Sequence, residues 1–166
     1  MTASLWQRLD QEYTAAIAAA MGKAGSYTDL VVQAVTIAAT WNPDTGPRPA
    51  VIVVSDKASQ QHGGHAGAAA IRLAVTYDYY AVATTEGPSY QATKAAAQTL
   101  HQRMIAVLQT WPAILAAAAA AGPGSTETPI RQKWGDSWID VRGRQSNGAG
   151  QHYGIAVVAW TVEGSA

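Results

Sequence analysis

The sequence has 166 residues, no cysteine, a formal net charge of zero and only 13% charged residues, about half the usual share of roughly 25%. This length fits one domain with a sizeable core, and the lack of cysteine excludes disulfides and thiolate chemistry. The charge balance lacks the basic field of nucleic-acid-binding proteins, so we expect no sequence-specific nucleic acid as a partner.

The first predicted element is a helix over residues 3–21. Its apolar residues recur at four-residue spacing, Ser4 is placed to cap its start, and Gly22 is a natural stop. The segment before it lacks the basic start and apolar run of a signal peptide. The alanine tract at residues 116–121 is too short to cross a bilayer. We therefore expect a soluble protein made in the cytoplasm, with no membrane partner.

Strands are predicted next. Residues 30–41 are rich in Val, Ile and Thr, and residues 42–49 form a loop with three prolines. The apolar run 50–54 is typical of a central strand covered on both faces. Residues 55–67 show no period and hold His62 and His65, so we predict a flexible loop joining two antiparallel strands. A third strand follows at about 70–84, with Tyr77 and Tyr79 on its apolar side.

The second half of the chain begins with a long helix over about 89–110, capped by Ser89. Its apolar stripe is predicted to consist of Ala92, Ala96, Leu100, Met104, Val107 and Leu108. Pro112 indicates a kink or a new helix start, giving a short helix over 112–121. Two further strands are predicted at 130–141 and 152–162, joined by a loop in which Asn147-Gly148 is a strong hairpin signal.

These elements predict one α+β domain over residues 1–166. Connections of hairpin length favour a mostly antiparallel sheet of about five strands. The sheet should pack against the long helix and the N-terminal helix, since two or three helices are too few to cover both faces of a parallel sheet.

The polar residues give no catalytic, metal or cofactor site. His62 and His65 are separated by two glycines and match no zinc spacing, so we expect them to bind no metal. Asp136 and Asp140 lie too far apart along a strand for paired acid/base work. The serines lack a nucleophile elbow, and the glycines fit no phosphate loop. A polar pocket around His101, His152 or Asp140 would be needed for the alternative of a small metal- or ligand-binding enzyme.

The aromatic residues suggest an interface. Three tryptophans and several tyrosines concentrate on the strands that flank the long helix, in a chain without phenylalanine. Most would fill the core, but Trp and Tyr also dominate contact hot spots. We select as interface candidates Trp41, Trp111, Trp134, Trp138, Trp160 and Tyr80.

The order of elements resembles the tail-terminator and tail-completion proteins of long-tailed phages. The likeness is carried by Ala50 to Val54, Arg72 to Ala83, the helix Ser89 to Leu108, and the last strand Tyr153 to Val162. It covers most of the chain through order and pattern. The segment from Pro112 to Gly124 and the long hairpin after it depart from the family pattern.

The resemblance implies a structural virion protein, not an enzyme. Such proteins form a homo-oligomeric ring, commonly a hexamer, that caps the tail tube and meets the head-side neck. The implied partners are further copies of the chain, the tail tube protein and a neck or connector protein, and the implied location is the phage tail. A head–tail connector or neck protein is the nearest alternative and differs mainly in its position within the particle.

The predicted sheet itself also favours assembly. Residues 30–54 contain no lysine, and the last strand carries no charged residue over 153–162. An unguarded apolar sheet edge needs a partner, and a repeated heterologous contact closes into a ring. We further expect the glycine-rich segments 56–69 and 143–150 to be mobile in the isolated protein.

Overall fold

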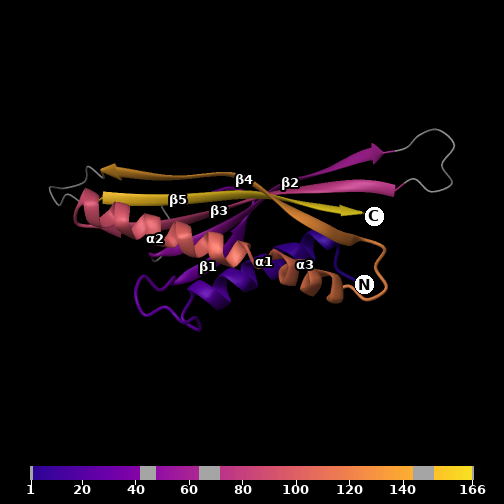
Figure 1. Ribbon diagram of the computed structural model, residues 1–166, viewed down its shortest axis with the longest axis horizontal. Helices are drawn as coiled ribbons and strands as arrows, with labels where there is room; N and C mark the ends of the chain where they lie inside the picture. The colour runs from indigo at the N-terminus through magenta and orange to yellow at the C-terminus, as the bar shows by residue number, and fades with distance from the viewer. Residues whose placement is uncertain (1, 42–47, 64–71, 144–151, 166) are drawn as a thin grey trace.

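The computed structural model describes residues 2–41, 48–63, 72–143 and 152–165. These residues form three helices and five strands in an α+β arrangement, as the sequence predicts (Figure 1). In order they are α1 (Leu5–Met21), β1 (Ala34–Ala38), β2 (Ala50–Gly63), β3 (Arg72–Gly87), α2 (Tyr90–Leu108), α3 (Trp111–Ala120), β4 (Thr128–Gly143) and β5 (His152–Ser165).

The five strands form one sheet in the order β1-β2-β3-β5-β4. The β2–β3, β3–β5 and β5–β4 pairs are antiparallel, which confirms a mostly antiparallel sheet. The β1–β2 pair is parallel, from Ala34 beside Ala50 to Ala38 beside Val54. The two edge strands are therefore β1, with five residues, and β4, with sixteen.

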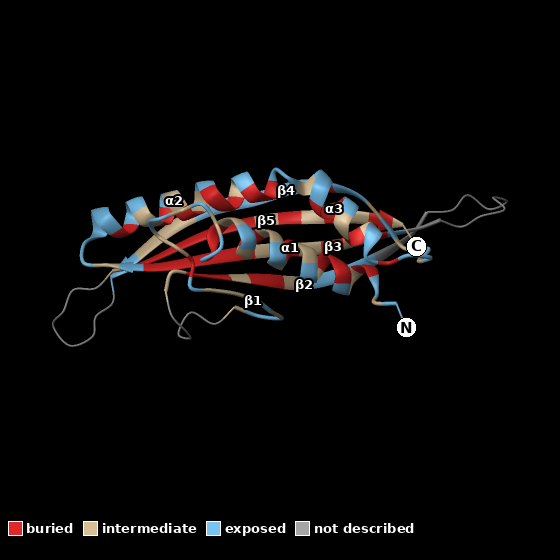
Figure 2. Ribbon diagram, turned by 90° about the horizontal axis from the view of Figure 1, so that it is seen from below, coloured by how far each residue is buried: buried red, intermediate tan, exposed pale blue. Residues whose placement is uncertain are grey.

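All three helices cover the same side of this sheet (Figures 1 and 2). The buried residues of α1 are turned toward the strands and include the whole predicted stripe, Leu5, Leu9, Tyr13, Ile17 and Met21. Ser4 and Gln7 form a capping box at the start of α1, and Ser89 caps α2 through the amide of Ala92. Among the described residues no helix lies on the opposite side, which we call the open face.

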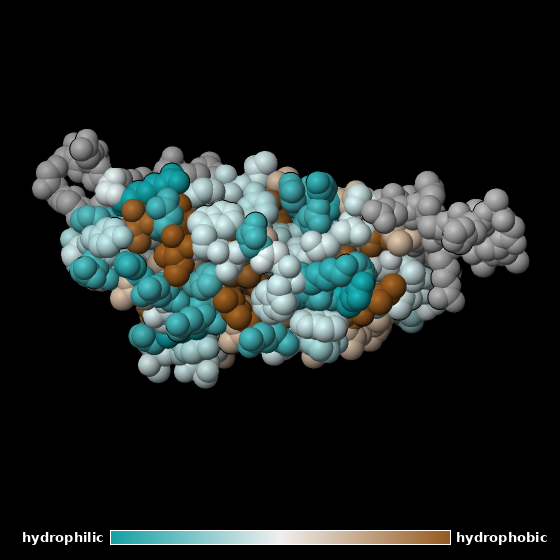
Figure 3. Space-filling model, turned by 45° about the horizontal axis from the view of Figure 1, so that its top comes forward, coloured by the Kyte–Doolittle hydropathy of each residue, from teal (hydrophilic) through white to brown (hydrophobic). Residues whose placement is uncertain are grey.

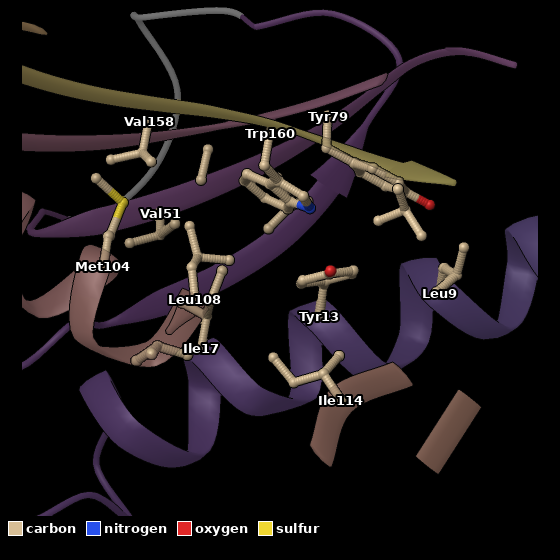
Figure 4. Packing of buried hydrophobic residues seen from close by; sticks show 14 of the residues in the cluster. Leu9, Tyr13, Ile17, Val51, Tyr79, Met104, Leu108, Ile114, Val158 and Trp160 are labelled. Atoms are coloured by element: carbon tan, nitrogen blue, oxygen red, sulfur yellow. The ribbon is translucent and has the colours of Figure 1, made fainter. Parts of the chain in front are cut away.

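The main core lies between the helices and the sheet (Figure 4). At its centre Tyr79 of β3 stacks on Trp160 of β5, with ring centroids 5.4 Å apart and ring planes 7° from parallel. Tyr13 of α1 contacts both rings, at 5.6 and 5.0 Å. Each of these three side chains is at most 2% exposed, so aromatic packing joins α1 to the two central strands.

Buried polar side chains fasten the chain around this core. The Tyr13 hydroxyl donates to Oε1 of Gln132 at 2.6 Å, and Nε2 of Gln132 donates to the carbonyl of Leu108. Arg103 donates to Asp29 through both its terminal nitrogens and lies over the ring of Tyr27, 3.8 Å from its centroid. These contacts hold β4 and the segment after α1 against the helical layer.

Two sequence predictions about the strands are wrong. Residues 55–63, predicted as part of a flexible loop, continue β2 and pair with β3 as far as Gly63 beside Arg72. The side chains at positions 56–59 are all exposed, and backbone pairing with β3 holds this part of the strand. The sequence therefore shows no alternation of apolar and polar residues there from which a strand could be predicted. The rest of the predicted loop, 64–67, and residues 144–150 with Asn147-Gly148 lie outside the described residues.

The first strand also differs from the prediction, which placed it at 30–41 within an antiparallel meander. Only Ala34–Ala38 pairs, and it runs parallel to β2. On α2 the predicted stripe is displaced in its first half, where Thr93 and Ala97 are buried while Ala92 is exposed. Alanines surround that half of the helix on all sides, so their pattern could not define a face.

Candidate functional site

The most exposed apolar side chains lie on the edge strands of the sheet. Among the described residues, five large hydrophobic side chains are exposed: Ile37, Tyr90, Ile130, Trp134 and Trp138. Three of these lie on β4 and one on β1, while only Tyr90 lies on a helix. An edge strand also leaves the main-chain groups of its outer side unpaired. Both edges of this sheet therefore combine unpaired backbone with exposed apolar surface.

Trp134 and Trp138 lie on opposite sides of the sheet, although four residues separate them. Trp134 is in register with the buried Trp160, whereas Trp138 is in register with Val157, three residues earlier on β5. Because alternate residues of a strand face opposite sides, Trp134 belongs to the helix-covered side and Trp138 to the open face. A register shift between Trp134 and Ser137 produces this switch. The β4 edge thus offers one tryptophan to each side.

On the open face, Trp138 borders a groove of about 390 Å³. We call it the Trp138 groove, and it is lined by Trp41, Tyr80, Val82, Trp138, Asp140, Arg142, Ile155, Val157 and Ala159. Arg142 pairs with Asp140 at 2.7 Å on its rim. The indole nitrogen of Trp41 is buried and has no hydrogen-bond partner among the described residues. In Figure 3, where the top of the molecule comes forward, brown apolar atoms form separate patches between teal polar ones.

The connection between β1 and β2 is anchored to the open face at both ends. Trp41 packs against the buried cluster formed by Val82, Tyr153, Ile155 and Val157. At the other end, the Arg48 guanidinium lies 4.2 Å from the ring centroid of Tyr153 and pairs with Glu86. Both described ends of this connection therefore lie on the open face, and the strands that it joins, β1 and β2, run parallel.

On the helix-covered side, a second groove of about 630 Å³ lies between α1 and the free edge of β1. We call it the α1–β1 groove, and it is lined by Ser4, Trp6, Gln7, Asp10, Ile37, Ala38, Ala39 and Ser55. Ile37, which is 42% exposed, is in register with the buried Val53, so it faces the same side as α1. The groove therefore combines an apolar wall with a carboxylate.

Asp10 is the charged group of the α1–β1 groove. Its Oδ1 atom accepts hydrogen bonds from the Tyr79 hydroxyl at 2.7 Å and the Ser55 hydroxyl at 3.0 Å. Burial raises the pKa of Asp10 above its ordinary value, and these two hydrogen bonds oppose that shift in part. Trp6 donates its indole N–H to the same Ser55 hydroxyl. Within the described residues, Oδ2 of Asp10 accepts no hydrogen bond and the carboxylate has no cationic partner.

The predicted interface aromatics occupy three different environments. Trp134 and Trp138 are 48% and 53% exposed, whereas Trp41 and Tyr80 are half-buried beside the Trp138 groove. Trp111 is half-buried against the main core. Trp160 is only 1% exposed and stacks on Tyr79. The selection of Trp160 as an interface residue is therefore wrong, because helices cover that side of β5.

The three polar residues that the sequence suggested for a pocket, His101, His152 and Asp140, lie apart from one another. His152 contacts Tyr90 at the start of α2, with ring centroids 6.4 Å apart, while His101 lies eleven residues further on, about 16 Å along the helix. Asp140 lies on the open face, in register with Ile155. Burial lowers the pKa of His101. The structure does not bring these three residues into one pocket.

The described part of the chain contains neither a cluster of metal-binding side chains nor a single helix that could span a membrane. No three His, Asp or Glu side chains there are grouped so that they could hold a metal ion. His65 and the side chain of His62 lie outside the described residues. No single described helix is long and apolar enough to span a membrane; α2 and α3 together meet the length and composition, and they are bent by 53°.

Sequence reasoning missed Ile37, Ile130, Trp6 and Asp10. The two isoleucines stand out only when the strand order places β1 and β4 at the edges, and five-strand order cannot be read from local pattern. Trp6 and Asp10 can be recognised as part of a groove only when the orientation of α1 over β1 is known.

The chain matches no protein-family model, and no curated protein is significantly similar to it in sequence.

Proposed function

We propose that this protein is the subunit of a closed homo-oligomeric ring that terminates a phage tail tube and joins it to the head-side neck. The order of helix, short strand, long β2–β3 hairpin, long helix and closing β4–β5 hairpin supports this proposal through its resemblance to tail-terminator proteins. By the same resemblance, the ring would be a hexamer bound to the tail tube protein.

One observation carries the assembly part of the proposal. Four of the five exposed large hydrophobic side chains in the described residues lie on the two edge strands, at opposite ends of the strand order. In this open sheet the two edge strands do not pair with each other. Contact between different edges of successive copies is heterologous, and such a contact produces a ring when its rotation closes after a whole number of copies.

A head–tail connector or neck protein remains the second candidate, since it uses the same chemistry at a different position in the particle. A small metal- or ligand-binding enzyme is the less favoured alternative, and it would need a polar pocket around His101, His152 or Asp140. The two structural candidates differ in their neighbours. A terminator binds the end of the tail tube, whereas a connector binds the portal side of the neck.

The test is a native mass of the purified protein, followed by an image of the assembled particle. We expect a single closed species of several copies, and density for a ring at the head-side end of the tail tube. A ring seated on the portal side would favour the connector. Single copies in the particle, or copies without mutual contact, would contradict both structural roles.

A further inference from the structure

We propose that Trp134 of one copy docks in the α1–β1 groove of the next copy, where its indole N–H donates to Oδ2 of Asp10. This inference rests on the proposed ring and specifies which two surfaces meet in it. The occupant of the groove is a second copy of this chain, presenting its β4 edge.

The first argument is geometric. β1 and β4 are the two free edges of one sheet, so β4 of a second copy can extend the sheet past β1 by backbone pairing. Within the sheet β4 runs in the opposite direction to β1, so antiparallel pairing of these two edges continues each face of the sheet from one copy to the next. Trp134 and Ile37 both belong to the helix-covered side, as their registers with Trp160 and Val53 show. Trp134 would therefore lie on the side where the α1–β1 groove opens.

The second argument is chemical. The groove offers the apolar side chains of Trp6, Ile37, Ala38 and Ala39, together with one carboxylate. Its volume of about 630 Å³ lies within the usual range of about 300–1,000 Å³ for binding pockets. Trp134 matches this composition because an indole is a large apolar ring with a single donor.

The carboxylate gives the groove its specificity. Oδ1 of Asp10 already accepts from Tyr79 and Ser55, while Oδ2 accepts from no described residue. A half-buried carboxylate oxygen without a donor is costly to cover with an apolar surface. A partner that covers this groove must therefore bring a donor, and Trp134 carries one.

Two variants and their mixture test the inference. Trp134→Ala destroys the β4 surface and keeps the groove, whereas Ile37→Arg blocks the groove and keeps β4. Both residues are more than 40% exposed, so both variants should fold, which circular dichroism and thermal unfolding would verify. Tyr90→Ala, equally exposed but on α2, is the matched control and should assemble normally.

We expect wild type and Tyr90→Ala to form rings and each of the two edge variants alone to be monomeric by native mass spectrometry. Mixed together, the edge variants should form heterodimers that do not grow, since each supplies one intact surface. Rings from either edge variant alone, or a mixture that stays monomeric, would overturn the inference while leaving the ring itself intact. A wild-type protein that stays monomeric at the highest soluble concentration would contradict both the Trp134 contact and the proposed ring.

Asp10→Asn examines the carboxylate separately. Asparagine can keep an acceptor toward Tyr79 and Ser55, but it replaces the second acceptor oxygen with an NH2 donor. We expect this variant to fold and to lose most of the ring population at a concentration where wild type is fully assembled. Unchanged assembly by Asp10→Asn would exclude the hydrogen bond to Trp134.

Discussion

The guanidinium of Arg8 lies against the backbone of Gly122, so closely that a Cβ atom at Gly122 would overlap Nη1 of Arg8. Arg8 is only 1% exposed, and its side chain reaches the turn after α3 from the first turns of α1. Nη1 donates to the carbonyl of Ala118 at 2.7 Å, and Nη2 donates to Ser125 and to the carbonyl of Glu127. One buried cation thus holds the α3–β4 connection onto α1.

We predict that Gly122→Ala destabilises the protein by about 1–3 kcal/mol, the cost of leaving one buried polar group unsatisfied. The new methyl group would displace the guanidinium from at least one of its three acceptors. Urea unfolding monitored by circular dichroism measures the loss. Gly143→Ala is the control, because nothing lies within 4 Å of a Cβ built there. Equal stabilities of the two variants would contradict the role given to Gly122.

Tyr13→Phe should also destabilise the fold, by about 1–3 kcal/mol. The change removes the hydroxyl that donates to Gln132, whose side chain is only 7% exposed and so would keep an unsatisfied oxygen. The matched control is Tyr90→Phe, since the ring of Tyr90 is 48% exposed and its loss of a hydroxyl leaves nothing buried. Chemical denaturation of the two variants side by side compares them, and a Tyr13→Phe protein as stable as Tyr90→Phe would refute the prediction.

The helices and their ends could be predicted because local chemistry determines them. Ser4, Gly22 and Ser89 cap or end helices as predicted, and the four-residue spacing from Leu5 to Met21 is the buried stripe of α1. The run Ala50–Val54 was likewise predicted as central, and β2 has a neighbour on each side. These features depend on side chains within one or two turns of each other.

The remaining features depend on contacts between distant segments. No local pattern indicates the parallel pairing of β1 with β2 or the positions of Trp41 and Arg48 on the open face. The register shift after Trp134 separates two tryptophans that a simple alternation would place on one side. Residue type alone also could not show that Trp160 is buried in the core whereas Trp138 is exposed. The candidate surfaces became visible only through strand order.

The stability of the protein should fall in the acid range as Asp10 ionises. Burial raises the pKa of Asp10 in the folded protein above the ordinary value of 3.8, so the native state holds its proton more tightly than the unfolded chain. The resulting stabilisation is complete below the ordinary pKa and is lost as the pH rises through the folded pKa. Asp10→Asn cannot ionise and should lack this loss.

The measurement is the difference in unfolding free energy between wild type and Asp10→Asn across the range from about pH 3 to pH 7. Wild type should lose stability relative to the variant as the pH rises. A difference that is constant with pH would show that the folded and unfolded pKa values of Asp10 are the same.

His62 and His65 should bind no zinc. His62 lies on β2 in register with Leu73, and two glycines separate it from His65. Forming a chelate would fix the backbone of these glycines, which lose more conformational entropy than any other residue. We expect no rise in melting temperature when zinc is added to the purified protein. A zinc-dependent rise that disappears in the variant with both residues changed to alanine would prove this prediction wrong.

Trp138 and Trp160 should separate assembly from folding when each is changed to alanine. Trp160 is 1% exposed and stacks on Tyr79, so its truncation leaves a cavity at the centre of the core and should lower the unfolding free energy by about 3–5 kcal/mol.

Trp138 is 53% exposed at the β4 edge, and its truncation should change the unfolding free energy of the monomer by about 0.5 kcal/mol or less. Because hot-spot tryptophans contribute about 2 kcal/mol or more to an interface, Trp138→Ala should instead weaken self-association. Denaturant unfolding reports the first effect and native mass spectrometry the second. If Trp138→Ala assembled as well as wild type, the open face beside β4 would not be part of the contact between copies, and assembly would have to use the helix-covered side alone.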